Sequence, residues 1–349
     1  MFDINGCKCH DLVAENTKPE LTFDKSKNLD EQRETLRARF TLLTGIDKIK
    51  ENDCPLEYEI VEEVELDGYK RIKIHYLSEK DMVVPCYLLV PNGVKKAPLC
   101  IVLQGGVKGY KYSVGLGDEY ELEGDFTKPD YSKVDYAIQA VKQGYCALAV
   151  EQRAMGELFP YDTRRNWMGR NRSGFTTFYA FTLGRTTVGE RVWDMKKAID
   201  VMENFPMVDT EKVIITGNQV GGVTAYYLAA YDDRVKISAP SSGFCSYKDS
   251  VMDISTTYCQ VIPKVYLHFD MPDLAQLIAP RKLLIISDKN EEIYPIDKAI
   301  ESFEKVKEIY TLYGAEENCK QVFKETPDAS WDKEIAWKEI NEMAKSLNW

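Results

Sequence analysis

From residue 99 to the C-terminus, short apolar runs alternate with longer stretches that carry apolar residues at helical spacing. The strand-like runs lie at 99–103, 145–150, 212–216, 234–238, 282–287 and 319–324, and the helical stretches at 132–143, 187–204, 221–231, 271–278, 296–313 and 333–346. Three strand-like runs (EYEIVEEVEL, YKRIKIHYL and MVVPCYLLVP) precede them without intervening helices. Successive strand–helix units form parallel strands covered by their helices. The sequence therefore predicts an α/β fold with a mostly parallel mixed sheet and helices on both faces.

The N-terminal part of the chain lacks this alternation. Its first residues are polar and aperiodic, and helical spacing of apolar residues occurs over 30–43, before Gly45. This pattern predicts one helix that ends at the glycine. We therefore expect an N-terminal arm with one helix over 1–56 and a single α/β domain over 57–349.

The charge balance limits the classes of partner. The 349 residues include 45 Lys and Arg and 56 Asp and Glu, a net charge of −11, which argues against general binding to nucleic acid or anionic membranes. No run approaches the roughly 20 apolar residues of a membrane span. The N-terminus lacks the basic and apolar parts of a secretory signal. We expect a cytoplasmic protein that binds neither nucleic acid nor membrane.

The cysteines indicate neither a disulfide framework nor a metal site. Nine cysteines without an export signal predict reduced thiols and no disulfide. Cys7, Cys9 and His10 form the only Cys/His cluster, and no second pair at matching spacing completes the four ligands of a zinc site. We expect no metal and no cofactor.

Residues 213–222 read VIITGNQVGG, an apolar strand followed by a tight glycine-containing turn and a helix. Small residues are needed at such a turn because the strand and the helix approach each other closely. This is the shape of the nucleophile elbow of α/β hydrolases, which has the pattern G-x-S-x-G. Here the central position is Gln219.

The surrounding segments resemble the acetyl xylan esterase and dienelactone hydrolase-like esterases of the α/β-hydrolase superfamily. The segments that carry the resemblance are LLVPNGVKKAPLCIVLQGG (88–106), EQRAMGE (151–157), GRTTVGERVWDMKKAIDVMENFPMVDTEKV (184–213), SSGFCSYKDS (241–250) and DMPDLAQLIAPRKLLI (270–285). The resemblance extends from about residue 57 to the C-terminus and implies the α/β-hydrolase fold.

The resemblance also implies where the site residues lie. The oxyanion-hole and pocket positions that it implies are Gln104, Gly105, Gly106, Val220, Arg153 and Cys259. The family usually has His-Gly-His at 104–106. Arg153 and Glu157 belong to the segment that resembles DQRGxGE, and we expect them to brace that loop through an ion pair.

The catalytic triad that the resemblance implies is incomplete. Gln219 replaces the serine, and a primary amide is not a nucleophile in ester hydrolysis. Glu291 stands at the acid position, because EEIYPI aligns with the family's DPIFPI. Ala329 in TPDASW stands where the family has its histidine, and no histidine follows His268. The order Ser–acid–His therefore cannot be completed.

Three functions are compatible with this pattern, and one of them is a structural subunit of a homo-oligomer. The first is a pseudo-esterase that binds a ligand without hydrolysing it, with the Gln219 amide bonded to a neighbour such as Glu291. The alternative is an active hydrolase or lyase with a rebuilt site that lacks the nucleophilic serine. Ser242 and Cys245 are expected to be structural, and no base that could activate a thiol lies beside Cys259 in the sequence. A Cys259–His268–Asp270 grouping is conceivable, but a structural His268 is the favoured interpretation.

The segment PYDTRRNWMGRNRSGF at 160–175 is strongly basic within an acidic chain. Its cations are Arg164, Arg165, Arg170 and Arg172. Arginine clusters bind carboxylates and phosphates through paired hydrogen bonds. One interpretation is that they bind an anion, and the other is a solvated lid or a salt-bridge patch between subunits of a homo-oligomer. The expected ligand is a small molecule, either anionic or an acylated sugar.

Overall fold

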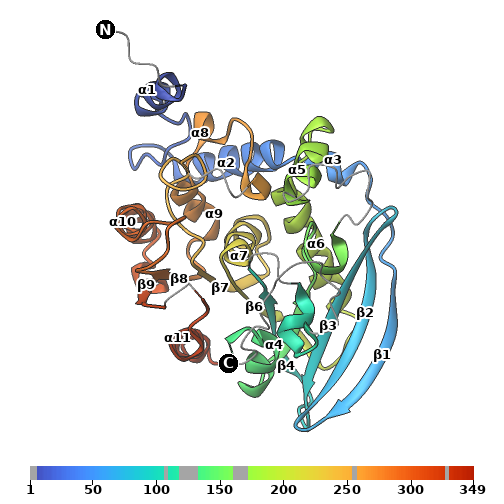
Figure 1. The fold of residues 1–349 in the computed structure, drawn as a ribbon. Coiled ribbons are helices and arrows are strands. Elements are labelled where there is room, and N and C mark those ends of the chain that lie inside the picture. The colour runs from blue at the N-terminus through green and yellow to red at the C-terminus, as the bar shows by residue number, and fades with distance from the viewer. Residues whose placement is uncertain (1–5, 106–108, 118–132, 160–171, 254–257, 327–329) are drawn as a thin grey trace.

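The computed structural model describes residues 6–105, 109–117, 133–159, 172–253, 258–326 and 330–349. The strands are β1 (Tyr58–Leu66), β2 (Tyr69–Glu79), β3 (Met82–Pro91), β4 (Ala97–Leu103), β5 (Cys146–Val150), β6 (Val208–Asn218), β7 (Val235–Ser241), β8 (Lys282–Asp288) and β9 (Cys319–Lys324). They form one sheet in the order β1-β2-β3-β5-β4-β6-β7-β8-β9 (Figure 1). In this order, neighbouring strands from β1 to β5 are antiparallel. Neighbouring strands from β5 through β4 to β9 are parallel. The predicted mostly parallel mixed sheet is confirmed.

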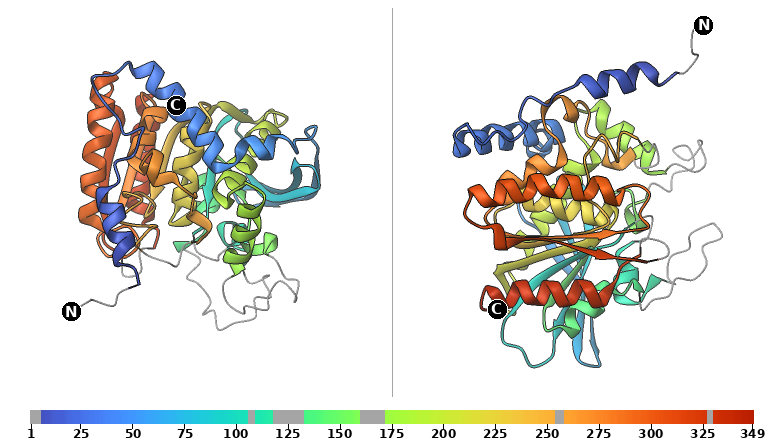
Figure 2. Two further views of the ribbon diagram at one scale, coloured as in Figure 1. Left: turned by 90° about the horizontal axis from the view of Figure 1, so that it is seen from above. Right: turned by 90° about the vertical axis from the view of Figure 1, so that its left-hand side faces the viewer.

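The helices are α1 (Lys8–Asn16), α2 (Leu29–Thr44), α3 (Ile46–Lys50), α4 (Tyr136–Lys142), α5 (Arg172–Thr182), α6 (Thr187–Met202), α7 (Val220–Tyr231), α8 (Val265–His268), α9 (Ala275–Ile278), α10 (Ile296–Leu312) and α11 (Lys333–Ser346). They cover both faces of the sheet, with α10 and α11 on opposite sides (Figure 2). Among the described residues, none of the helices combines the length and the apolar character needed to cross a membrane.

Two apolar cores follow from the alternation of strand side chains. In β4, Leu99, Ile101 and Leu103 join the core under α2, α6, α7 and α10, whereas Cys100 and Val102 join the core under α4 and α11. Both faces are apolar because both are covered, as expected for a parallel sheet. All nine cysteines are free thiols in the structure.

The N-terminal segment contains three helices rather than the single one expected. α2 matches the predicted helix and ends at Gly45, whose φ is 73°. Leu36 and Phe40 of α2 are fully buried in the main core, so this part of the segment is integral to the fold. α1 was missed because it buries no residue, and α3 because it has only 5 residues.

We predict that Phe40→Ala lowers the free energy of unfolding by about 3–5 kcal/mol, the usual loss for a buried phenylalanine. The Phe40 ring has no exposed surface and lies 5.8 Å from the Tyr227 ring and 6.3 Å from the Phe269 ring, measured between centroids. Urea denaturation measures the change. The control Leu42→Ala, on the same helix but 58% exposed, should change stability by less than about 0.5 kcal/mol. Similar effects from both variants would contradict this packing.

Candidate functional site

The turn at Gln219 has the backbone geometry of a nucleophile elbow. β6 ends at Asn218 and α7 begins at Val220, so Gln219 alone makes the turn. Its φ of 50° and ψ of −117° form a conformation that costs a non-glycine residue about 1–3 kcal/mol. The Gln219 N–H donates to the carbonyl of Ser241 at 2.8 Å, which ties the turn to β7.

Glycines make this turn sterically feasible. A Cβ at Gly221 would lie 2.4 Å from the carbonyl oxygen of Leu103, and a Cβ at Gly217 would lie 2.7 Å from the same oxygen. At Gly222, a Cβ would lie 2.5 Å from the carbonyl oxygen of Ser241. These distances are far inside van der Waals contact, so no larger residue fits without a backbone shift.

The loop after β4 lies against the elbow, where the resemblance places an oxyanion loop. A Cβ at Gly105 would lie 2.5 Å from the carbonyl oxygen of Asn218 and 3.2 Å from the Gln219 Cβ. Gln104 is buried, and its amide donates to Ser113 Oγ at 2.7 Å and to the carbonyl of Val134 at 2.5 Å. The Gln104 side chain therefore braces the loop.

The structure places Glu291 beside Gln219, in the loop after β8. Glu291 Oε1 accepts the N–H of Ile293 at 3.0 Å, whereas Oε2 is buried and has no hydrogen-bond partner of normal geometry within the described ranges. Burial raises the pKa of Glu291, and the Ile293 N–H and the Gln219 amide offset only part of this rise. The acid position therefore holds a carboxyl group that is only partly satisfied.

Two further side chains border the elbow. Ser242 follows β7 with a positive φ of 46°, and its buried Oγ has no hydrogen-bond partner among the residues that the structure describes. A Cβ on the next residue, Gly243, would lie 2.8 Å from the Gln219 carbonyl oxygen, so this segment touches the elbow. Cys259 is buried in a small apolar cluster with Met155 and Val220.

A buried ion pair that the sequence analysis did not identify joins the ends of β8 and β9. Lys324 Nζ lies 3.1 Å from Asp288 Oδ2, and neither side chain is exposed. Lys324 also donates to the carbonyl of Ser330, and Thr326 Oγ1 donates to Asp288. Burial lowers the pKa of Lys324. Burial alone would raise the pKa of Asp288, but hydrogen bonds from Thr326 and Asn290 and the Lys324 charge lower it overall.

These contacts fix the chain on both sides of 327–329, which includes the predicted position Ala329. Ala329 itself lies outside the described residues, and so does Gly106. Of the basic cluster, Arg164, Arg165 and Arg170 also lie outside them. Arg172 begins α5, but its side chain is not described.

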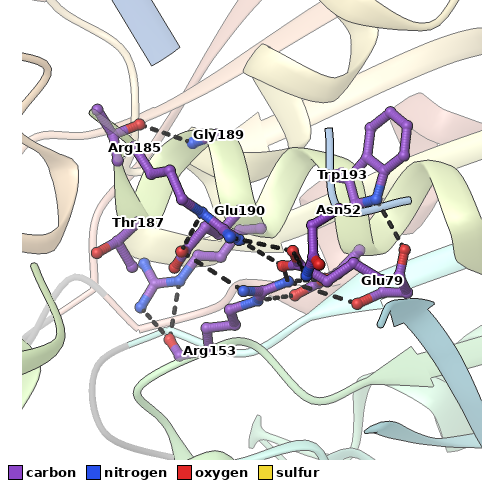
Figure 3. Close-up of polar contacts among 12 residues, drawn as sticks. Asn52, Glu79, Arg153, Arg185, Thr187, Gly189, Glu190 and Trp193 are labelled. Atoms are coloured by element: carbon purple, nitrogen blue, oxygen red, sulfur yellow. Dashed lines mark hydrogen bonds and ion pairs between the residues drawn. The ribbon is translucent and has the colours of Figure 1, made fainter. Parts of the chain in front are cut away.

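Arg153 does not line the elbow as a free pocket residue but lies in a buried ionic cluster (Figure 3). Its guanidinium donates to Asp194 Oδ1 and Oδ2, each at 2.8 Å, and to Glu79 Oε1 at 2.7 Å. Arg185 also pairs with Glu79, and both arginines contact Glu190. The cluster ties the loop after β5 to the end of β2 and to α6.

The expected ion pair between Arg153 and Glu157 is wrong. Glu157 instead pairs with Lys111 at 2.8 Å and accepts a hydrogen bond from the Tyr110 hydroxyl at 2.9 Å. Both residues brace the same loop, but to different neighbours. The residue types indicated that Arg153 and Glu157 form ion pairs, but not which charged side chains they contact.

His268 does not join Cys259. Its Nδ1 lies 2.8 Å from Glu20 Oε2, and Arg39 contacts the ring. Asp270 accepts the backbone N–H groups of Tyr247 and Met271. The conceivable Cys–His–Asp grouping is therefore not formed.

Within the described ranges, no three His, Cys, Asp or Glu side chains are grouped so that they could hold a metal ion.

The strand order and the glycine-packed turn between β6 and α7 are those of an α/β-hydrolase fold. A family model described as "Abhydrolase family" matches residues 8–333, and the chain belongs to this family.

Sequence and structure comparisons give the same fold. A proposed hydrolase of Bacillus subtilis (strain 168), YtaP, is 24% identical over 255 residues, which cover 68% of this chain and 80% of YtaP. A crystal structure of a proposed acetyl xylan esterase from Bacteroides fragilis NCTC 9343 has a TM-score of 0.73 at 16% identity, covering 97% of this chain and 90% of that one. Acetyl xylan esterase 1 from Thermoanaerobacterium sp. JW/SL YS485 has a TM-score of 0.57 at 14% identity, and the match covers 99% of each chain.

We predict that Glu291→Gln becomes progressively more favourable relative to the wild type as pH rises from 4 to 7. Burial raises the pKa of Glu291 in the folded state, so the folded protein holds this proton more tightly than the unfolded chain does. Wild-type stability from this group is therefore present at low pH and lost as pH rises through the raised pKa. Urea denaturation of both proteins at several pH values measures the difference. A pH-independent difference would contradict the prediction.

We predict that Lys324→Met destabilises the fold by about 3–5 kcal/mol, because it leaves the Asp288 charge buried without its cation. The double variant Lys324→Met/Asp288→Asn should recover most of that loss, since no unpaired charge remains. The control Lys289→Met removes an exposed pair with Glu325 and should cost at most about 1 kcal/mol. Equal losses in the single and double variants, measured by chemical denaturation, would show that the ion pair is not the cause.

Proposed function

We propose that this chain is a non-hydrolytic member of the esterase-like α/β hydrolases, and that it binds a small acylated ligand at the elbow. The observation that carries the proposal is the position of Gln219. Its backbone has the strained geometry of a nucleophile, and its side chain is an amide that lies against Glu291.

The chemistry of the amide supports binding rather than hydrolysis. A glutamine side chain cannot be deprotonated by a general base to attack an acyl carbon, so no acyl-enzyme forms on it. Its N–H groups and its carbonyl can instead donate to and accept from a bound molecule. The Gln219 side chain also leaves the backbone beside Gly105, with its Cβ 3.2 Å from the position that a Cβ on Gly105 would take.

The charges beside the elbow favour a neutral ligand at its inner end. Asp288 and Glu291 place two carboxyl groups here against the single amino group of Lys324, and Lys324 is already bonded to Asp288. A carboxylate or phosphate placed there would be repelled. The acetyl xylan esterases among the structural relatives lead us to propose an acylated sugar.

Binding and hydrolysis are tested separately with acetylated xylose. Calorimetry should show saturable binding to the wild type, and chromatography should show no release of acetate. Gln219→Trp, which fills the elbow, should weaken binding about tenfold or more, as expected when a ligand loses its contacts in a filled site. Phe178→Trp places the same side chain on an exposed position of α5 and should leave the affinity unchanged. Absence of binding, or equal effects of the two variants, would reject the proposed ligand site.

We predict that a fluorophosphonate probe does not label the wild type and that Gln219→Ser alone does not gain hydrolysis of p-nitrophenyl acetate. A serine without a base remains a poor nucleophile, because loss of one triad member already costs several orders of magnitude. Gln219→Ser/Ala329→His should gain a trace of activity that Glu291→Gln then reduces. Labelling of the wild type, or strong activity of the single variant, would overturn the non-hydrolytic assignment.

A rebuilt catalytic site is the second candidate function, and Ser242 is the observation in its favour. Ser242 lies next to the elbow and combines a strained backbone with a buried hydroxyl that has no partner in the described part of the chain. Under this candidate, wild-type ester turnover would be present and Ser242→Ala would abolish it, while Ser246→Ala would not. Ser246 lies in the same segment, but its hydroxyl is bonded to Asp249. Absence of turnover in the wild type rejects this candidate.

A further inference from the structure

The strand β1 ends the sheet on one side, at the outer edge in Figure 1, and within the described part of the chain it pairs with β2 only. Its 9 residues are exposed except Val64 and Leu66, which are half-buried. β9, at the opposite edge, has 6 residues, and both of its end residues are buried. An open edge presents a row of backbone N–H and C=O groups with which a further strand can pair.

Apolar side chains accompany this open edge. Ile60 and Val61 are 48% and 47% exposed, and Tyr58 is also exposed although its ring packs on Phe205. Branched and aromatic residues are the types that pack well between neighbouring strands. A further strand would therefore cover apolar surface in addition to pairing with the backbone of β1.

The charges along β1 determine which kind of strand can pair there. Residues 57–67 contain six acids and no lysine or arginine. The cations that face them lie one strand inwards, on β2, and are Lys70, Arg71, Lys73 and His75. The acids are in excess even if His75 is protonated. This excess lies on the outer side, where an added strand would be only about 5 Å away.

The same charges oppose pairing with a second copy of this chain. Two copies of β1 paired antiparallel about Glu62 would bring Glu62 opposite Glu62 and Glu59 opposite Glu65. A pairing about Val61 would bring Glu59 opposite Glu63. Like charges directly opposite each other destabilise a sheet. The acids therefore protect the edge from copies of itself and favour a strand of the opposite charge.

We propose that the outer edge of β1 binds a basic, extended peptide segment of another protein as an additional strand. Backbone hydrogen bonds hold the segment, its lysines or arginines face the glutamates, and its apolar residues cover Ile60 and Val61. Four strands separate β1 from β6, so this surface is distinct from the elbow and does not depend on the ligand proposed there.

A peptide of the same length as β1, with alternating lysine and valine, tests the proposal on the wild-type protein. Calorimetry should show saturable binding, and a glutamate–valine peptide should bind at least about tenfold more weakly. A lysine–valine peptide with every backbone nitrogen methylated keeps its charge but cannot donate hydrogen bonds to β1, so its affinity should fall by a similar factor. Absence of saturable binding, or undiminished affinity of either control peptide, would overturn the proposal.

Amide hydrogen exchange locates the bound peptide. Exchange within residues 57–66 should slow by about tenfold or more when the lysine–valine peptide saturates the protein, because the outward N–H groups of β1 acquire partners. Unchanged exchange in these residues would place the peptide elsewhere and would contradict strand addition.

A matched pair of double variants tests the charges. Glu59→Lys/Glu65→Lys reverses two exposed acids of β1 and should weaken binding of the lysine–valine peptide about tenfold or more. Glu301→Lys/Glu304→Lys makes the same change in net charge at exposed positions of α10, which packs beside β9. This second variant should leave the affinity within about twofold, because charges so far from β1 are screened by salt. Equal losses in the two variants would show that the peptide responds only to net charge and would reject the site.

Discussion

The close packing of β6 against α7 across three glycines determines the geometry of the candidate site. Gly217 and Gly221 leave no space between their Cα atoms and the carbonyl oxygen of Leu103, so β4, β6 and the first turn of α7 are held at backbone contact. The chain must therefore change direction at a single residue, Gln219. Its side chain projects at the carboxyl ends of the strands, where the segments after β4, β7 and β8 also converge.

Local patterns in the sequence were sufficient to predict the sheet, the turn and the helix that follows it. Strand periodicity depends on neighbouring residues, and the glycine requirement at the turn involves residues only four positions apart. The ionic contacts could not be predicted in this way. Arg153 contacts Glu79, which lies 74 residues away in the sequence. Asp288 contacts Lys324 because β8 and β9 are neighbours in the sheet, and the sequence alone does not show that they are. Any of several acids would have been an equally reasonable partner for Arg153.

The direction of the Gln104 side chain could not be predicted from the sequence either. The loop containing Gln104 and Gly105 lies where the resemblance placed it, against the elbow. Gln104 nevertheless directs its amide to Ser113 and Val134, whose positions depend on how the chain returns from the loop. The motif therefore located the backbone, but the role of the side chain depended on tertiary neighbours.

The backbone strain at Gln219 has a consequence for engineering. Since the glycine contacts impose the turn, the strained geometry does not depend on a reactive side chain at its apex. The apex is thus a display position, where different functional groups could be presented to the same surroundings from one fixed backbone. Such a series would separate what a side chain contributes by its chemistry from what it gains by being held in this orientation.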